Sequence, residues 1–260
     1  MRPAEAQASV QDRIGRTIDY LRLSVTDRCN LRCRYCVPPG PVSWSPREDH
    51  LTNGEIARLV SLIARRGVSK VRITGGEPLV RPGIVDLVRD LSRITEIADL
   101  PMTTNGLLLE RHAEALKASG LARVNVSLDT LDPETFRRIT GEDALEKVWA
   151  GIDAAIRAGL APIKINMVVQ RGINDHECAT MARLTLDRPL HVRMIEYMPV
   201  ADYALWARHH VSNADRRTVG ACYRTDVPCE GIAAFAGEVA WPDRHRSAIP
   251  AAVCGPCNES

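Results

Sequence analysis

Short apolar stretches alternate with helix-period amphipathic stretches from about residue 18 to residue 196, and this alternation constrains the fold most strongly. Such strand-then-helix units favour parallel strands joined by right-handed crossovers. Periodicity leaves two forms of the sheet open, one doubly wound and one curved into a partial barrel. The strands are expected over Tyr20–Val25, Lys70–Thr74, Asp99–Thr103, Arg123–Ser127, Pro162–Val169 and His191–Glu196.

The helix boundaries carry their own signals. Glu55–Arg66 has one apolar face, and Thr52 with Glu55 has the spacing of a capping box at its start. The pair Asp132-Pro133 provides an N-cap and a first-turn proline for a later helix. Glycines follow three helical patterns, where a C-terminal cap would place them. They are Gly67, Gly120 and Gly159.

Composition excludes several classes of protein. A chain of 260 residues that is 45% hydrophobic can bury a core and is not a disordered chain. A net charge of +2, with no basic run, gives no reason to expect a nucleic-acid partner. No apolar run approaches the roughly 18 residues that cross a membrane. The first 20 residues lack the apolar core of a secretory signal, so we expect a cytoplasmic protein.

Three cysteines stand close together directly after the first expected strand. Cys29, Cys33 and Cys36 form a C-x3-C-x2-C cluster. Three thiolates at this spacing can hold three irons of a [4Fe–4S] cluster and leave the fourth iron open. A structural zinc site normally takes four protein ligands, and no histidine stands nearby to complete one with these three cysteines. Three reduced cysteines without a metal remain the alternative that spacing alone leaves open.

The cysteine motif with its aromatic residue Tyr35 resembles the signature of the radical S-adenosylmethionine (SAM) superfamily. The surrounding run LRLSVTDRCNLRCRYCVP more narrowly resembles the GTP 3′,8-cyclases of molybdenum-cofactor biosynthesis. The resemblance covers roughly residues 12–200. Further matching segments follow in order: VRITGGEPLVRP at 71–82, TTNGLLL at 103–109, NVSLDTLDP at 125–133, KINMVVQRGIND at 164–175 and RMIEYMPV at 193–200.

The resemblance implies a partial (β/α)6 barrel over residues 12–200, after an N-terminal tail at 1–11 and before a short irregular C-terminal extension at 201–260. It also implies that Cys29, Cys33 and Cys36 hold a [4Fe–4S] cluster. One electron from that cluster would cleave SAM to methionine and a 5′-deoxyadenosyl radical. Four residues match the family's SAM contacts. They are Tyr35, Gly76, Ser127 and Met198.

GTP is the family's substrate, and it is converted to (8S)-3′,8-cyclo-7,8-dihydroguanosine 5′-triphosphate for molybdopterin synthesis. Three cations among the matching residues suit a triphosphate. The implied partners are GTP, an electron donor, a downstream cyclic pyranopterin monophosphate synthase and, as one option, a second copy of the chain. The residues that match GTP contacts are Arg22, Arg72, Thr103 and Lys164.

The C-terminal region departs from the family's pattern. Cys254 and Cys257 resemble the first part of the family's second [4Fe–4S] motif, whose third cysteine is absent before Ser260. Cys222 or Cys229 would supply the missing ligand in one interpretation. In another, the four cysteines form a structural zinc site. In a third, the chain is a fragment or disrupted copy that binds SAM without completing cyclisation. A radical SAM enzyme with another substrate, such as a peptide, is a further alternative.

Overall fold

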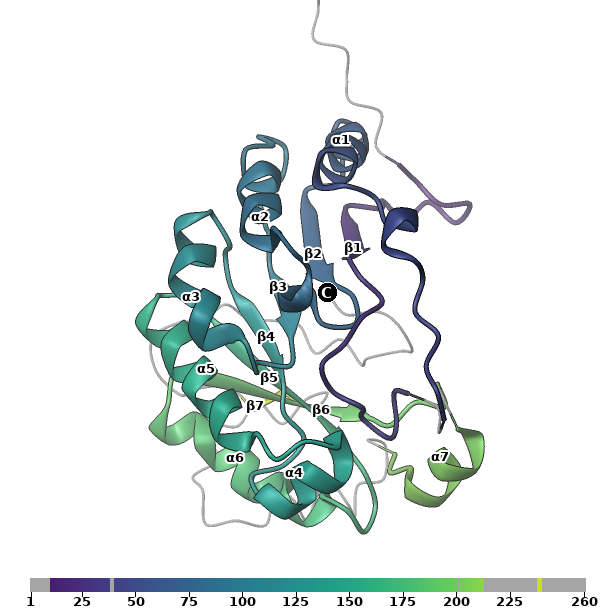
Figure 1. The fold of residues 1–260 in the computed structure, drawn as a ribbon, viewed down its shortest axis with the longest axis vertical. Helices are drawn as coiled ribbons and strands as arrows, with labels where there is room; N and C mark the ends of the chain where they lie inside the picture. Colours follow the sequence, from purple (N-terminus) through teal and green to yellow (C-terminus); the bar gives the residue numbers. More distant parts are fainter. Residues whose placement is uncertain (1–9, 38–39, 201, 213–237, 240–260) are drawn as a thin grey trace, which may run out of the picture. The chain divides into compact units, whose positions relative to one another are not determined.

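The computed structural model describes residues 10–37, 40–200, 202–212 and 238–239 (Figure 1). The chain forms two compact units. Unit 1 contains Met1–Asn30, Ser43–Asn125 and Trp149–Ala161, and unit 2 contains Leu31–Val42, Val126–Val148 and Pro162–Ser260. Cys222, Cys229, Cys254 and Cys257 lie outside the described residues. In the described part of the chain, no helix combines the length and apolar character needed to cross a membrane.

Unit 1 contains the first three strand-and-helix units. Its strands are β1 (Tyr20–Ser24), β2 (Lys70–Thr74) and β3 (Met102–Thr104). Its helices are α1 (Asn53–Ala64), α2 (Ile84–Ser92), α3 (Leu109–Ala118) and most of α5 (Leu145–Arg157). Short 3-10 helices occupy Arg47–Asp49 and Pro78–Val80. Within this unit, Figure 1 shows α1, α2 and α3 along one side of the three strands.

Unit 2 continues the alternation. Strand β4 (Val124–Ser127) begins in unit 1 and ends in unit 2. The remaining strands are β5 (Ile163–Val169), β6 (Leu190–Glu196) and the short β7 (Glu238–Val239). The helices are α4 (Pro133–Thr140), a 3-10 turn at Asp175–Glu177, α6 (Cys178–Asp187) and α7 (Tyr203–His209).

The strands follow one another in chain order along the sheet, from β1 to β7. Strand pairs β1–β2, β2–β3 and β5–β6 are parallel, and β7 is antiparallel to β6. Among the strands of the described residues, β7 does not pair with β1, so this sheet is open. The prediction of an α/β fold with successive parallel strands, as in a partial (β/α)6 barrel, is confirmed.

The predicted caps are also confirmed. The Thr52 hydroxyl accepts the Glu55 backbone N–H while the Glu55 carboxylate accepts that of Thr52, which completes a capping box at α1. The Asp132 side chain caps α4 through the Thr135 N–H. Such caps satisfy backbone donors that have no partner inside the helix. The three glycines predicted to end helices all have positive φ angles: Gly67, Gly120 and Gly159.

Each unit has one apolar and one polar strand face, because successive side chains in a strand point to opposite faces. In unit 1 the buried apolar face includes Leu23, Val71, Ile73 and Met102. The alternate positions of the same strands carry Tyr20, Arg22, Ser24, Arg72, Thr74 and Thr103. In unit 2 the alternate positions of β5 and β6 carry Lys164, Asn166, His191 and Arg193. One face of these strands is therefore apolar and packs in the core. The other face carries polar side chains, which indicates a ligand-binding face in each unit.

Two local features differ from the sequence-based expectations, and one helix end was not among those expectations. Strand β3 begins at Met102 rather than Asp99, because Pro101 has no N–H to donate to a ladder. Gly141, with φ 82°, ends α4 and separates it from α5. Helix α7 forms where the regular alternation was expected to fail. The Asp202 side chain accepts the Leu205 N–H at its start, and the Trp206 Nε1–H donates to the Tyr197 carbonyl at 2.7 Å.

Candidate active site

The three clustered cysteines are distributed over both units. Cys29 belongs to unit 1, whereas Cys33 and Cys36 belong to unit 2. All three are free thiols, with Cys36 exposed and the other two partly buried. A sulfur-only donor set in one short loop fits an iron–sulfur cluster. Among the described residues, no three His, Cys, Asp or Glu side chains are already gathered in the way a bound metal ion requires.

In unit 1, the cysteine-bearing loop is held by the two glycines that follow β2. A Cβ at Gly76 would lie 2.3 Å from the Arg28 carbonyl oxygen, and one at Gly75 would lie 2.5 Å from that of Thr26. The Gly76 N–H donates to Thr26 O at 2.7 Å and the Glu77 N–H to Arg28 O at 2.8 Å. Only glycine permits this approach of two backbones. Gly76, a predicted SAM contact, therefore also fixes the chain immediately before Cys29.

The Glu77 carboxylate joins the loop after β2 to the loop after β3. It is buried, and it accepts the Thr104 hydroxyl at 2.7 Å and the backbone N–H groups of Asn105 at 2.6 Å and Leu79 at 3.0 Å. Burial raises the pKa of the Glu77 carboxyl, and these hydrogen bonds oppose the rise. Since a buried carboxylate needs such donors, Glu77 determines how the β3 loop lies against the β2 loop.

In unit 2, Tyr35 anchors the second part of the cysteine-bearing loop. Its hydroxyl donates to Asp129 Oδ2 at 2.7 Å, and its ring packs edge-on against Tyr197 with centroids 6.0 Å apart. Two backbone bonds join the same segment to the end of α4, from the Arg32 N–H to Thr140 O and from the Arg34 N–H to Ile139 O. Cys33 and Cys36 therefore sit in a segment that is fixed at three points.

The buried Asp129 carboxylate accepts two hydrogen bonds. Its Oδ1 accepts the Val168 N–H at 2.8 Å, and its Oδ2 accepts the Tyr35 hydroxyl. Burial raises the pKa of the Asp129 carboxyl to about 6, although both hydrogen bonds lower it. The pKa of Tyr35 is raised well above its ordinary value, first by burial and then by the Asp129 charge.

Three of the predicted GTP contacts share the polar strand face of unit 1. Arg22 lies opposite Arg72 in the β1–β2 register. Thr103 follows Met102, which pairs with Ile73 and so lies on the opposite, apolar face. Arg22 is exposed, whereas Arg72 is 5% exposed and its guanidinium lies 5.4 Å from the centre of the Tyr20 ring. The two cations thus lie side by side on one face of the sheet.

The buried side chain of Asn125 lies on β4 in the same unit. Among the described residues, neither its Oδ1 nor its Nδ2 atom has a hydrogen-bond partner. A buried amide without partners costs roughly 1–3 kcal/mol. A polar ligand on this face would offset that cost, so the unit is suited to bind one.

The fourth predicted GTP contact and three SAM contacts lie in unit 2. Lys164 is 9% exposed on β5 and pairs with His191 of β6 in the register. Ser127 ends β4, and Met198 lies just after β6 and is exposed. Ser127 and Met198 thus lie at or just after the carboxyl ends of their strands, where parallel α/β folds bind their ligands. Lys164 is the second residue of β5, and Tyr35 lies in the loop that follows β1.

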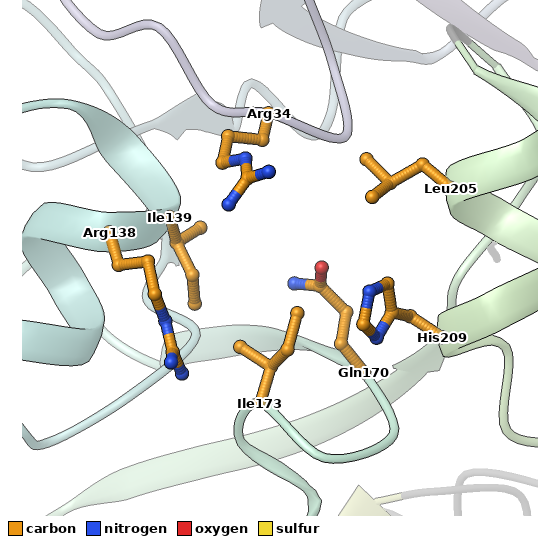
Figure 2. A pocket seen from close by; sticks show the side chains of 7 residues that line it. All are labelled: Arg34, Arg138, Ile139, Gln170, Ile173, Leu205 and His209. Carbon is orange, nitrogen blue, oxygen red and sulfur yellow. The ribbon is translucent and has the colours of Figure 1, made fainter.

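A separate pocket of unit 2 is lined by seven residues (Figure 2). The Arg34 and Arg138 guanidinium groups and the Gln170 amide are drawn around it. The Gln170 Nε2 atom is buried and has no hydrogen-bond partner among the described residues. The other lining residues are Ile139, Ile173, Leu205 and His209. None of the seven residues is among the predicted cofactor or substrate contacts.

Two polar residues near the cysteines were not singled out by the sequence analysis. Asn105 lies in the TTNGLLL segment, and its side-chain nitrogen is 3.8 Å from Cys29 Sγ. Asp129 lies in NVSLDTLDP. The segments themselves matched the family, and the only signal for either residue was a polar side chain within two positions of the end of a β-strand.

The chain matches the model of one superfamily and is similar to several curated proteins that share one name. The model of the radical SAM superfamily matches residues 23–185. The chain is 52% identical over 194 residues to a GTP 3′,8-cyclase of Petrotoga mobilis, covering 75% of this chain and 60% of the relative. It is 53% identical over 191 residues to that of Heliobacterium modesticaldum, covering 74% and 58%. The chain thus spans about 60% of the length of these curated relatives.

Among solved structures, SuiB of Streptococcus suis bound to its precursor peptide aligns with a TM-score of 0.60 at 21% identity, covering 73% of this chain and 42% of SuiB. A similarity at this identity concerns the fold alone. The superfamily match covers more than half of the chain and includes β-strands from both units as well as all three clustered cysteines. The chain belongs to the radical SAM superfamily.

Proposed function

We propose that the chain carries the radical SAM part of a GTP 3′,8-cyclase. The observation that carries the proposal is its identity of about one half to proteins of that name across both units. The reaction would convert GTP to (8S)-3′,8-cyclo-7,8-dihydroguanosine 5′-triphosphate, the first step of molybdopterin synthesis. The alternatives of a SAM-binding remnant and of a peptide substrate have no comparable observation in their favour.

Cys29, Cys33 and Cys36 would hold a [4Fe–4S] cluster with one open iron, at which SAM binds. Tyr35, Gly76, Ser127 and Met198 would contact SAM. With both groups bound, the site would supply radical chemistry at ribose C3′ that joins this carbon to guanine C8. The protein's own part is to fix the reacting atoms and to exclude competing reactions.

Arg22, Arg72, Thr103 and Lys164 would bind GTP. The common strand face of Arg22 and Arg72 supports this assignment, because guanidinium groups bind phosphate oxygens with two donors each. Lys164, which is 9% exposed on the polar face of β5, adds a third cation, and cations suit a triphosphate. The triphosphate would therefore be held by charge, while the ribose is presented to SAM.

We assign residues 12–200 to the radical SAM core, residues 1–11 to a tail and residues 201–260 to a C-terminal extension. Cys254 and Cys257 in this extension would contribute to a second cluster, with Cys222 or Cys229 as the third ligand. An electron donor and a downstream cyclic pyranopterin monophosphate synthase complete the expected set of partners, and a homodimer is one assembly. We place the protein in the cytoplasm.

The proposal is tested with anaerobically reconstituted protein, SAM, dithionite and GTP. Mass spectrometry then follows 5′-deoxyadenosine and the cyclised nucleotide. Lys164→Met should abolish the nucleotide product, while Lys117→Met, which removes an exposed lysine of α3, should leave it unchanged.

Formation of both products by the unaltered chain supports the cyclase. Formation of 5′-deoxyadenosine alone, at a rate that GTP does not alter, would contradict it and favour a different substrate or a remnant. An iron content near four per chain indicates one cluster, and a content near eight indicates two.

A further inference from the structure

The side chain of Asn105 connects the loop after β3 to the first cysteine of the motif. Its Nδ2 atom lies 3.8 Å from Cys29 Sγ and 2.7 Å from Asn30 Oδ1. Asn105 is 9% exposed, and all three residues belong to unit 1. The contact joins positions 76 residues apart in the chain.

The orientation of the Asn105 amide follows from its other partner. Its Oδ1 atom lies 3.1 Å from the Leu107 backbone nitrogen and accepts that N–H. A backbone N–H can be accepted only by the amide oxygen, so the NH2 group must point the other way. One of its hydrogens is directed to Asn30 and the second to the Cys29 sulfur.

The Asn105 backbone is fixed as firmly as its side chain. Its N–H donates to Glu77 Oε2 at 2.6 Å, and Glu77 Oε1 accepts the hydroxyl of the preceding Thr104 at 2.7 Å. The Thr104 hydroxyl oxygen in turn accepts the Gly106 N–H at 3.1 Å. The buried Glu77 therefore aims the Asn105 amide at Cys29.

We propose that Asn105 is a positioning residue that donates an N–H hydrogen bond to the Cys29 sulfur and raises the reduction potential of the cluster held there. A hydrogen bond to a ligating sulfur draws negative charge from it, so the added electron is stabilised. The inference rests on the proposed first cluster. It is independent of GTP, because neither the bond nor the potential involves a substrate.

Two variants test the bond. Asn105→Asp keeps an oxygen for the Leu107 N–H but has no side-chain N–H for the sulfur. Asn105→Leu retains the approximate size and removes every polar atom. Asn30→Ala is the matched control, since it removes the neighbouring acceptor and leaves the Asn105 amide beside Cys29.

The measurement is an EPR-monitored redox titration without SAM or GTP. It uses the 260-residue chain with Cys254→Ala and Cys257→Ala, so that only the first cluster forms. Iron content and circular dichroism are matched before titration. We expect a roughly tenfold weaker reduction equilibrium in both Asn105 variants, which is about 59 mV for one electron. Asn30→Ala should titrate like the parent.

Unchanged potentials in both Asn105 variants would overturn the proposal. So would a failure of both to bind iron while their circular dichroism is native, because Asn105 would then be needed for assembly rather than for the potential. If the parent itself binds no cluster, the proposed cofactor is wrong. If the parent titrates as expected but forms no cyclised nucleotide, only the proposed function is wrong.

Discussion

The Tyr35 hydroxyl donates a 2.7 Å hydrogen bond to Oδ2 of Asp129, a residue 94 positions further along the chain. The bond ties the segment with Cys33 and Cys36 to the end of β4, and both residues belong to unit 2. Asp129 is in turn bound to β5 through the Val168 N–H. One buried carboxylate thus positions the aromatic residue of the cysteine motif.

Removing the Tyr35 hydroxyl should weaken this unit. We expect Tyr35→Phe to lower the free energy of unfolding by about 1–3 kcal/mol, because the buried Asp129 loses a donor. Tyr203→Phe is the matched control, since Tyr203 is 70% exposed and should change stability little. Urea denaturation of the iron-free, reduced proteins measures both. Equal stability of the two variants would show that the Tyr35–Asp129 bond contributes nothing.

The raised pKa of Asp129 predicts a pH dependence of stability. Its carboxyl is protonated more readily when folded, with a pKa of about 6 against an ordinary 3.8. The stabilising contribution of this carboxyl is therefore fully present below about pH 4, and it is lost as the pH rises through 6. Relative to Asp129→Asn, which does not titrate, the unaltered protein should lose up to about 3 kcal/mol between pH 4 and 7.

Paired denaturation curves at each pH measure this difference, and the comparison cancels the other titrating groups. A difference that stays constant from pH 4 to 7 would show that Asp129 titrates at its ordinary pKa. A difference of the opposite sign would show that the folded protein prefers the ionised carboxylate.

The close approach of Gly76 to Arg28 predicts a large effect of one methyl group. Gly76→Ala places a Cβ 2.3 Å from a carbonyl oxygen of the backbone, which cannot move aside as a side chain would. We expect a loss of about 1–3 kcal/mol or more, together with loss of iron binding. Gly54→Ala in α1 has open space around its Cβ and should stabilise the protein slightly. If both variants have the stability and iron content of the parent, the glycine is not required by packing.

The placement of Arg22 predicts a phosphate-specific binding defect. Arg22→Gln should weaken GTP binding by about 10- to 100-fold, the effect of losing one charge-assisted hydrogen bond. Binding of guanosine, which has no phosphate, should not change. Arg58→Gln is the control, because it removes an exposed arginine of α1 that is not among the predicted GTP contacts. Equal loss of GTP and guanosine affinity would assign Arg22 to the base or to folding instead.

The strands were predictable because apolar and polar side chains alternate within them. Lys70–Thr74 was located to the residue, and the capping box at Thr52 was visible because its two members are three residues apart. The beginning of β3 was predicted less well. Pro101 has no backbone N–H to donate, although its carbonyl still accepts the Ile73 N–H. Patterns within a few residues thus predicted strands and helix caps, whose hydrogen bonds depend on the local sequence.

The contacts that hold the cysteines were not predictable in the same way. Asn105 reaches Cys29, and Tyr35 reaches Asp129, only after distant segments have folded together. Helix α7 depends similarly on the bond from Trp206 to the Tyr197 carbonyl. The family resemblance named the segments that meet, and the structure identified the side chains that join them within each unit.

The most direct test of the proposed function uses GTP deuterated at ribose C3′, with GTP deuterated at C2′ as the control. The reconstituted protein is incubated with SAM and dithionite, and 5′-deoxyadenosine is analysed by mass spectrometry. We expect one deuterium in the 5′-deoxyadenosine from the C3′-labelled nucleotide and none from the control. Unlabelled 5′-deoxyadenosine from both would contradict the claim that this chain presents the GTP ribose to SAM.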